Sequence, residues 1–350
     1  MKLEPHLDPC RHCGACLSFC VWDAAEREMR PAGPDLCRDC QVCYRTCPRL
    51  LYERAELAAA RFPDVQDGPW GRYRAVYTVR TAQPPPGVQD GGLTTRLGQF
   101  LLDTGRAEAI LVTGRRADWL PQPYWATDGD GVARACGSKY AAAPALAVLG
   151  EGWERFRRVA LIVLPCQAAA LARLLGHRPE WVERIALIVG LFCTESFYQN
   201  GGGLTRLVEE RLQRPVEQVE RFDIKRGRFT AHAGEAVAEW RMKELHDVVW
   251  PVCLACQDLT AEFADLSVGS IGSGEGANTA IVRSQAAEEV LVSGVEKGLW
   301  TLSALENPEG LAKQCDRKRG NPEQLSPEER TLYGRATVRG NWKRRQRRVG

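Results

Sequence analysis

Two cysteine-rich stretches decide how the N-terminal part of this chain folds: Cys10-Arg-His-Cys13-Gly-Ala-Cys16-Leu-Ser-Phe-Cys20 and Cys37-Arg-Asp-Cys40-Gln-Val-Cys43-Tyr-Arg-Thr-Cys47-Pro48. Both have the spacing C-x2-C-x2-C-x3-C, so the whole pattern occurs twice within residues 10–47. Three thiolates at this spacing can cover one face of an iron–sulfur cubane, and the fourth is supplied by the other stretch. The repeated spacing therefore indicates two [4Fe–4S] clusters.

The expected ligands cross between the two stretches, as they do in bacterial ferredoxins that carry two clusters. One cluster would be held by Cys10, Cys13, Cys16 and Cys47, and the other by Cys37, Cys40, Cys43 and Cys20. Zinc sites and disulfides are the alternatives, but zinc sites usually pair two C-x2-C hooks across a longer gap. Val21 follows Cys20 where Pro48 follows Cys47, which is a departure from the ferredoxin pattern.

Length and composition place the two stretches at the start of a larger globular protein. A chain of 350 residues is too long for a ferredoxin alone and indicates two domains. Its 44% apolar and 26% charged residues are ordinary for a globular protein, and no apolar run reaches the roughly 18–20 residues that cross a bilayer. With 14 cysteines and no signal-peptide core after Met1, we expect a cytoplasmic protein whose cysteines bind metal.

The net charge of +3 is unevenly distributed along the chain. The last eight residues hold five basic side chains, Lys343, Arg344, Arg345, Arg347 and Arg348. We interpret them as a solvated tail, with docking to an acidic electron carrier as the alternative. Nucleic acid is not an expected partner, and the sequence leaves the oligomeric state open, a homo-oligomer included.

After the ferredoxin-like module at residues 1–62, the pattern becomes that of a mixed-sheet α/β domain over residues 63–300, followed by an extension at 301–350. Three apolar runs have the length and branching of buried strands: Ala109–Thr113, Val159–Leu164 and Ile185–Leu191. Helices are expected near residues 51–61, from Leu93, around Leu171–Leu175 and over Leu204–Leu212, with a linker at Pro63–Pro69. The chain has neither G-x-G-x-x-G nor G-x-x-x-x-G-K-[ST], so an ordinary dinucleotide site or P-loop is not supported.

A third set of cysteines lies in the α/β region. Cys166 and Cys193 stand at or just past the ends of two apolar runs, where open α/β sheets collect their ligands. Cys253 and Cys256 add a C-x2-C pair. These four could close a third [4Fe–4S] site, and buried free thiols are the alternative. The remaining pair, Cys136 and Cys315, has no partner at useful spacing and is expected to be structural.

Seven short sequence blocks follow one another along the α/β region. They are Gln89-Asp-Gly-Gly-Leu-Thr94, Gly137-Ser-Lys-Tyr140, Pro165-Cys-Gln167, Leu191-Phe-Cys-Thr-Glu-Ser-Phe197, Phe222-Asp-Ile-Lys-Arg-Gly-Arg-Phe229, Cys253-Leu-Ala-Cys-Gln-Asp258 and Ala264-Asp-Leu-Ser-Val-Gly-Ser-Ile-Gly-Ser273. As a set, over residues 73 to about 300, they resemble the family of coenzyme F420-reducing hydrogenase/dehydrogenase beta subunits. That resemblance implies an iron–sulfur flavoprotein that binds FAD and holds a third cluster with Cys166, Cys193, Cys253 and Cys256.

The resemblance also indicates which residues would bind FAD. Glycines let a cofactor approach the backbone, and the free N–H groups of a helix start favour phosphate. The candidates in the three blocks are Gln89, Asp90, Gly91, Gly92, Thr94, Ser138, Lys139, Tyr140, Gly269, Ser270 and Gly272. Lys139, whose block is expected to precede a helix, is also the candidate catalytic residue, because its ammonium could neutralise a phosphate or the charge of a reduced flavin. A hairpin turn, a solvated lysine and a flexible loop are the plainer interpretations of the three blocks.

What the resemblance implies about function is an oxidoreductase that passes a hydride between coenzyme F420 and FAD and single electrons through the clusters to or from ferredoxin. Two alternatives stay open: an electron-transfer beta subunit of a hydrogenase or formate dehydrogenase complex, and a ferredoxin-dependent reductase of another substrate such as a tetrapyrrole. Two departures from the family pattern fall near the expected cofactor edge, Val163-Leu164 and Ala277-Asn278-Thr279. These departures affect the expected identity of the second substrate more than the expected binding of the flavin.

Overall fold

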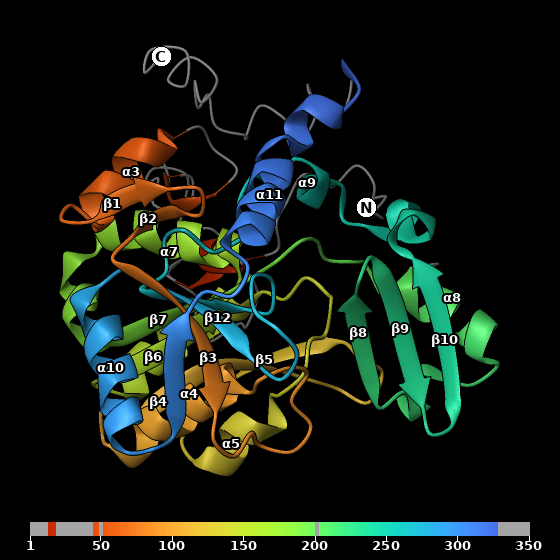
Figure 1. The fold of residues 1–350 in the computed structure, drawn as a ribbon, viewed down its shortest axis with the longest axis horizontal. Helices are drawn as coiled ribbons and strands as arrows, with labels where there is room; N and C mark the ends of the chain where they lie inside the picture. The colour runs from red at the N-terminus through yellow and green to blue at the C-terminus, as the bar shows by residue number, and fades with distance from the viewer. Residues whose placement is uncertain (1–12, 19–44, 49–51, 200–202, 328–350) are drawn as a thin grey trace, which may run out of the picture.

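The computed structural model describes residues 13–18, 45–48, 52–199 and 203–327. Its centre is an eight-stranded mixed sheet in the order β13-β3-β12-β11-β7-β6-β4-β5 (Figure 1). The strands are β3 (Ala75–Thr81), β4 (Ala109–Arg115), β5 (Pro121–Ala126), β6 (Val159–Val163), β7 (Ile185–Leu191), β11 (Leu266–Gly269), β12 (Asn278–Val282) and β13 (Trp300–Ala304). The central strands β4, β6, β7 and β11 are parallel, while β5, β12 and β13 each pair antiparallel with a neighbour.

Helices cover both faces of this sheet because its central strands are apolar on both sides. One face is covered by α3 (Arg54–Arg61), α6 (Leu149–Arg155) and α7 (Pro165–His177). The other is covered by α4 (Leu93–Asp103), α5 (Gly129–Arg134) and α10 (Gln285–Glu296). Alternate residues of β4 show the division, since Leu111 faces α7 and Ile110 faces α4.

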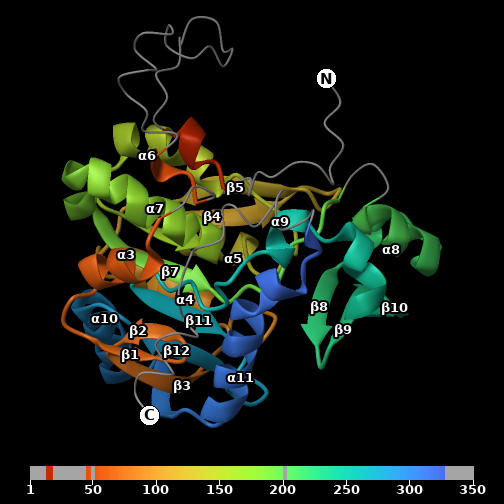
Figure 2. The ribbon, with the colours of Figure 1, turned by 90° about the horizontal axis from the view of Figure 1, so that it is seen from above.

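A smaller antiparallel sheet lies beside the large one, and Figures 1 and 2 both show it apart from the main body. It is formed by β8 (Arg221–Lys225), β9 (Arg228–Ala233) and β10 (Ala236–Arg241), and α8 (Leu204–Leu212) covers it. Phe222, Phe229 and Trp240 point to the helix side and build a separate core there. The family block at residues 222–229 is therefore the β8–β9 hairpin.

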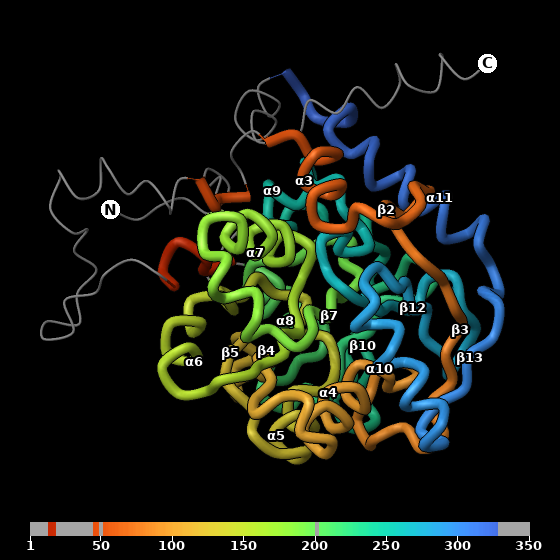
Figure 3. The backbone as a smooth tube through the Cα atoms, turned by 90° about the vertical axis from the view of Figure 1, so that its left-hand side faces the viewer, coloured from red at the N-terminus to blue at the C-terminus, as the bar shows by residue number. Residues whose placement is uncertain are grey.

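Shorter elements complete the fold. The α-helical ones are α9 (Pro251–Leu254) and α11 (Pro308–Arg319), and the 3-10 turns are η2 (Ala15–Leu17), η3 (Ala145–Val148), η4 (Pro179–Arg184), η5 (Val216–Gln218), η6 (Met242–Val248) and η7 (Asn321–Gln324). Figure 3 shows α3 and α11, which come from opposite ends of the described chain, on the same side of the molecule. Leu311 and Cys315 of α11 pack against Trp70 and Ile281.

The expected mixed α/β architecture with a large sheet is confirmed, as are the strands at β4, β6 and β7 and the helices at α4, α7 and α8. The predicted linker is partly wrong, because it contains β1 (Gln66–Gly68), which pairs with β2 (Gly71–Tyr73). The domain limits stay a prediction. The boundary expected at residue 300 falls within β13, a strand that pairs with β3 of the large sheet. In the residues that the structure describes, no helix is long and apolar enough to span a bilayer.

Candidate functional site

A cavity of about 340 Å³ opens at the carboxyl ends of the parallel strands. Val112, Ile162, Leu191 and Val268 of β4, β6, β7 and β11 line its floor. Ligand sites of open α/β sheets collect at this edge because the loops that follow parallel strands meet there. Nine of the predicted flavin residues line the cavity: Gln89, Asp90, Gly92, Thr94, Ser138, Lys139, Tyr140, Gly269 and Ser270.

The first block places the start of α4 at the cavity wall. Gly92 is the N-cap with φ 74°, a left-handed conformation that favours glycine, and it has no capping side chain. Asn278 takes the N–H of Leu93 at 3.0 Å, while Thr94 and Thr95 line the cavity. The remaining first-turn amides of α4 are therefore placed to meet an anionic group.

Gly91 is required by close approach to the neighbouring strand. A Cβ built on Gly91 would lie 2.7 Å from Asn278 Oδ1 and 2.9 Å from the carbonyl carbon of Ala277. Backbone atoms cannot move aside like the end of a flexible side chain. Even an alanine at this position would displace the α4 start or β12.

Lys139 lies at the cavity, but its ammonium donates hydrogen bonds to backbone carbonyls of neighbouring residues. Only 7% of the residue is exposed, and Nζ donates to the carbonyls of Ala135 at 2.6 Å, Cys136 at 3.1 Å and Gly137 at 2.8 Å. These carbonyls follow α5, so the block ends one helix, and η3 and α6 follow it after residues 141–144. Burial lowers the pKa of Lys139 to about 8. The lysine is therefore a buried C-terminal cap whose charge borders the cavity.

Tyr140 ties the cavity to the small sheet. Its hydroxyl oxygen accepts the amide of Gln89 at 2.5 Å and the backbone N–H of Ile224 at 3.0 Å, and Gln89 Oε1 accepts the N–H of Ser138 at 3.2 Å. Burial raises the pKa of Tyr140 to about 12, so the phenol stays protonated. The two predicted blocks are thus joined by direct hydrogen bonds.

Asp90 stands at the same wall with its carboxylate half-buried. Lys225 Nζ of β8 lies 3.8 Å from Asp90 Oδ1. Burial raises the pKa of Asp90, and the nearby Lys225 and Ser270 act against that rise. The small sheet therefore contributes a cation to the cavity mouth.

The loop after β11 is held in place by hydroxyl groups. Ser273 Oγ lies 2.8 Å from both Thr78 Oγ1 and Thr279 Oγ1, and Gly272 O accepts the N–H of Asn307 at 2.9 Å. Gly272 has φ 101°, and a Cβ on Gly269 would overlap the ring of Phe192. This loop is a fixed close-approach surface and not a flexible one.

Three of the four cysteines expected to hold the third cluster gather at the cavity's edge. Burial raises the pKa of Cys193 to about 12, with the nearby charge of Lys318 opposing and those of Cys253 and Cys256 adding to the rise. Lys318 Nζ, on α11, donates to the carbonyls of Thr194 and of Cys253, the latter at 3.5 Å. An ammonium thus stands among three thiols.

The predicted metal ligands stay predictions. Cys166 is the second residue of α7, the helix that packs against η2. In the described ranges, no three His, Cys, Asp or Glu side chains are arranged as a metal site. Of the N-terminal ligands, the structure describes Cys13, Cys16 and Cys47. The other five, Cys10, Cys20, Cys37, Cys40 and Cys43, lie outside the described residues, as does the basic tail.

Two family profiles cover most of the chain that builds this cavity. The coenzyme F420 hydrogenase/dehydrogenase beta subunit N-terminal profile matches residues 76–150, and the C-terminal profile matches residues 156–308. This chain belongs to the family of coenzyme F420 hydrogenase/dehydrogenase beta subunits. The family is one of electron-transfer oxidoreductases, and its N-terminal profile begins within β3, after α3.

Several relatives of this chain are named for coenzyme F420. It is 29% identical over 299 residues to one of the subunits of F(420)H(2) dehydrogenase of Methanosarcina mazei, a match that covers 81% of each chain. It is 30% identical to the beta subunit of coenzyme F420 hydrogenase of Methanothermobacter thermautotrophicus, over 67% of this chain and 86% of the relative. Coenzyme F420-dependent sulfite reductase of Methanocaldococcus jannaschii is 28% identical and matches 91% of this chain but 52% of its own length.

A solved structure has the same fold. A chain in the structure titled as the xenon derivatization of the F420-reducing [NiFe] hydrogenase complex from Methanosarcina barkeri superposes with a TM-score of 0.70 and 26% identity. The match covers 77% of this chain and 96% of that one. The shared fold therefore accounts for nearly all of that chain, while this chain has additional residues.

Sequence reasoning missed several residues of the site. Asn278, which caps α4, was flagged only as a departure from the family pattern. Gln167 closes the start of α7 by accepting the N–H of Leu164 at 2.8 Å, and it donates to Ala143 O at 2.8 Å. Lys318 gave no signal, because its partners lie in segments 65 and 124 residues away.

Proposed function

We propose that this chain passes a hydride between coenzyme F420 and a bound FAD, and single electrons through [4Fe–4S] clusters to or from ferredoxin. The observation that carries the proposal is the cavity, where residues of three separate family blocks meet at the carboxyl edge of the sheet. When bound, FAD supplies the exchange between two-electron and one-electron chemistry. The names of the relatives from Methanosarcina mazei and Methanothermobacter thermautotrophicus support coenzyme F420 as the substrate.

The residues at the cavity fit an anionic, aromatic cofactor. The amides of Thr94 and Thr95 at the start of α4 would meet a phosphate, and the close contact of Gly91 with Asn278 and Ala277 holds that helix start in place. The apolar floor of strand residues excludes water from the ring system. Lys139 places a fixed positive charge beside the cavity, where a low dielectric strengthens its effect.

A second function is an electron-transfer beta subunit within a hydrogenase or formate dehydrogenase complex. The match to a chain of a hydrogenase complex over 96% of that chain favours it. The two functions differ in whether the purified chain turns over alone. Reoxidation of reduced coenzyme F420 by the isolated protein with ferredoxin supports the first, and turnover only after partner subunits are added supports the second.

Cofactor content tests the proposal directly. Protein purified without oxygen is expected to hold about 12 iron and 12 sulfide per chain, from three four-iron cubanes, and to release one FAD on denaturation. Metal and sulfide analysis and the flavin spectrum give these values. About eight iron would remove only the third cluster, whereas stoichiometric zinc without sulfide would refute the cluster assignment.

Gly91→Ala tests whether the close contact of Gly91 at the start of α4 is needed for FAD binding. The new methyl group must displace Asn278 or the backbone of Ala277. Overpacking of this kind costs about 1–3 kcal/mol, so FAD affinity should fall roughly 10- to 100-fold. Flavin fluorescence titration of the FAD-free protein measures the change. Gly176→Ala in α7 is the matched control, since its Cβ would meet nothing within 4 Å. Unchanged FAD binding in both variants would contradict a role of the Gly91 contact in cofactor binding.

A further inference from the structure

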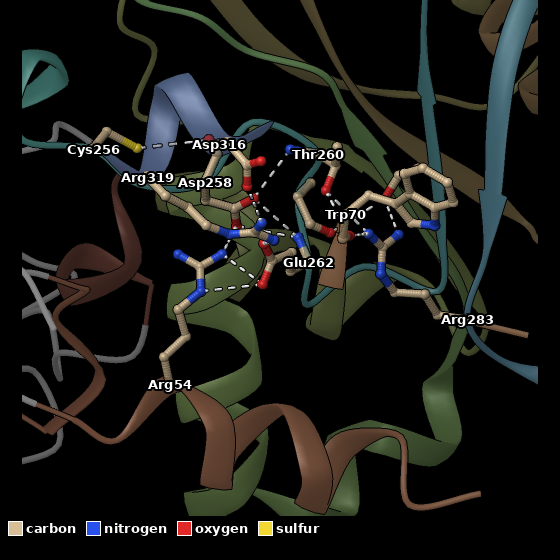
Figure 4. Close-up of polar contacts among 11 residues, drawn as sticks. Arg54, Trp70, Cys256, Asp258, Thr260, Glu262, Arg283, Asp316 and Arg319 are labelled. Atoms are coloured by element: carbon tan, nitrogen blue, oxygen red, sulfur yellow. Dashed lines mark hydrogen bonds and ion pairs between the residues drawn. The ribbon is translucent and has the colours of Figure 1, made fainter. Parts of the chain in front are cut away.

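Two buried carboxylates follow the C-x2-C pair and form the centre of an ion network (Figure 4). The Asp258 carboxylate accepts the backbone N–H groups of Thr260 and Glu262, each at 3.1 Å. These bonds close the turn that begins two residues after Cys256, whose thiol donates to Asp258 O at 3.7 Å. We call residues 253–262 the cysteine turn. The geometry of the turn thus depends on the orientation of the Asp258 carboxylate.

The cations that balance these carboxylates come from two distant helices. Arg54 of α3 lies 3.2 Å from Asp258 Oδ2 and 2.9 Å from Glu262 Oε2. Arg319 of α11 lies 3.2 Å from Glu262 Oε1. Figure 4 shows the two guanidinium groups approaching the carboxylates from α3 and α11. Arg283 also acts on both carboxylates, but one cation does not balance two buried negative charges, so the two helices supply the rest.

The α11 side of the network also binds the cysteine turn through its backbone and side chains. The Gln257 amide donates to Arg319 O at 3.0 Å, and Asn321 donates to Cys256 O at 3.2 Å. Lys318 Nζ lies 3.5 Å from Cys253 O. Three residues at the end of α11 and just beyond it therefore hold both cysteines of the pair.

The charges show that each carboxylate depends on its arginine partners. Burial would raise the pKa of Glu262, but Arg54 and Arg319 outweigh it and hold the pKa below its usual range. Asp258 depends on the same arginine through the contact of Arg54 with its Oδ2. The pKa of Arg54 is raised by Glu262 and Asp258 in spite of its burial. The network is a single electrostatic unit.

Arg54 and Arg319 lie outside both matched family ranges, at residues 76–150 and 156–308, whereas Asp258 and Glu262 lie inside. Arg54 also follows Cys47 by seven positions, so it belongs to the segment that leads out of the N-terminal cysteine stretches. The network is therefore the point where that segment, the cysteine turn and the C-terminal helix are joined.

We propose that Arg54 and Arg319 are positioning residues that make the geometry of the cysteine turn depend on the docking of α3 and α11. The contacts stand by themselves, while their purpose, to fix Cys253 and Cys256 relative to the N-terminal electron path, rests on the proposed function. Docking of α3 supplies the charge that orients Asp258, and Asp258 in turn holds the backbone after Cys256. The N-terminal segment and the third cysteine site are thus assembled together.

Hydrogen exchange with mass spectrometry of the full chain tests the coupling. In Arg54→Met, the amides of the cysteine turn, those of Thr260 and Glu262 above all, should exchange roughly 10- to 100-fold faster, as expected for local opening without global unfolding. Arg61→Met is the matched control, because Arg61 also lies on α3 and pairs with Asp265 at 3.1 Å but does not contact Asp258. It should leave the turn unchanged. Strand β4 serves as the internal reference for global folding.

Arg54→Lys keeps a positive charge and should restore most of the protection, though not the paired contacts of a guanidinium. If Arg54→Met fails to fold, Arg319→Met takes its place, because it removes the α11 guanidinium 3.2 Å from Glu262, and wild-type exchange at the turn in that variant would overturn the proposal. Wild-type exchange at the turn in Arg54→Lys and Arg54→Met would overturn the proposal, as would equal acceleration in Arg61→Met. Hydrogen exchange at the cysteine turn does not depend on bound cofactors. It can therefore refute the coupling while the cofactor content supports the proposed function, or support the coupling while the cofactor content refutes that function.

Discussion

Lys139→Met is expected to slow hydride transfer to the cavity cofactor, or to weaken FAD retention, by roughly 10- to 1,000-fold, the range for loss of a pre-organised electrostatic contact. The ammonium of Lys139 is buried and fixed by three carbonyl groups, so it does not need to reorganise during the reaction. Stopped-flow reduction of the bound flavin by reduced coenzyme F420 measures the rate. Lys297→Met, at an exposed lysine after α10, is the control.

The pH dependence distinguishes a charge effect from a purely structural one. The folded pKa of Lys139 is lowered to about 8 from 10.5 because burial disfavours the ammonium. Below pH 8 this charge therefore lowers the free energy of unfolding by about 3 kcal/mol, and the loss is relieved between pH 8 and 10.5, where the unfolded chain binds more protons. Urea unfolding of the wild type should show this gain with rising pH, and Lys139→Met should not.

Lys139→Arg separates charge from shape at the same position. A planar guanidinium keeps the positive charge but cannot place three donors toward the carbonyls of Ala135, Cys136 and Gly137 in the same way. Partial recovery of the rate is expected. Unchanged FAD occupancy and an unchanged rate in Lys139→Met would mean that the lysine only caps α5.

Sequence patterns predicted the part of the fold that depends on neighbouring residues. The runs at β4, β6 and β7 are apolar throughout because both faces are covered, and this pattern needs no knowledge of distant partners. The start of α4 could be predicted from Gly91 and Gly92 followed by Leu93, a turn before an amphipathic helix. The positions of these elements then brought the predicted flavin blocks to a single cavity.

Contacts between distant segments could not be predicted from the sequence. Arg54 and Glu262 are 208 residues apart, and a lone arginine after a cysteine module gives no indication of a buried carboxylate. Asn278 departs from the family pattern, yet its role appears only when β12 lies beside the start of α4. The orientation of Lys139 likewise depends on where α5 ends, which local pattern fixes poorly. Long-range polar partners were thus the main omission.

Glu262→Met is expected to lower the free energy of unfolding by about 3–5 kcal/mol, because it leaves buried guanidinium groups without their main counter-charge. Glu262 is 8% exposed and pairs with both Arg54 and Arg319. Urea unfolding and the thermal midpoint measure the loss. Glu210→Met, which breaks the exposed pair with Arg206, is the control and should change stability by less than about 1 kcal/mol.

A double variant shows whether the network acts as one unit. Arg54→Met with Glu262→Met removes one charge of each sign, so its loss should be smaller than the sum of the single losses by about 0.5–3 kcal/mol. The pKa of Glu262 is held below 4.5 by Arg54 and Arg319, so its stabilisation is present above pH 4.5 and is lost on acidification through the folded pKa. The single variants should therefore differ from wild type most near neutral pH. Additive losses would show that Arg54 and Glu262 stabilise the fold independently. Such a result would contradict the electrostatic coupling that the geometry of the cysteine turn implies.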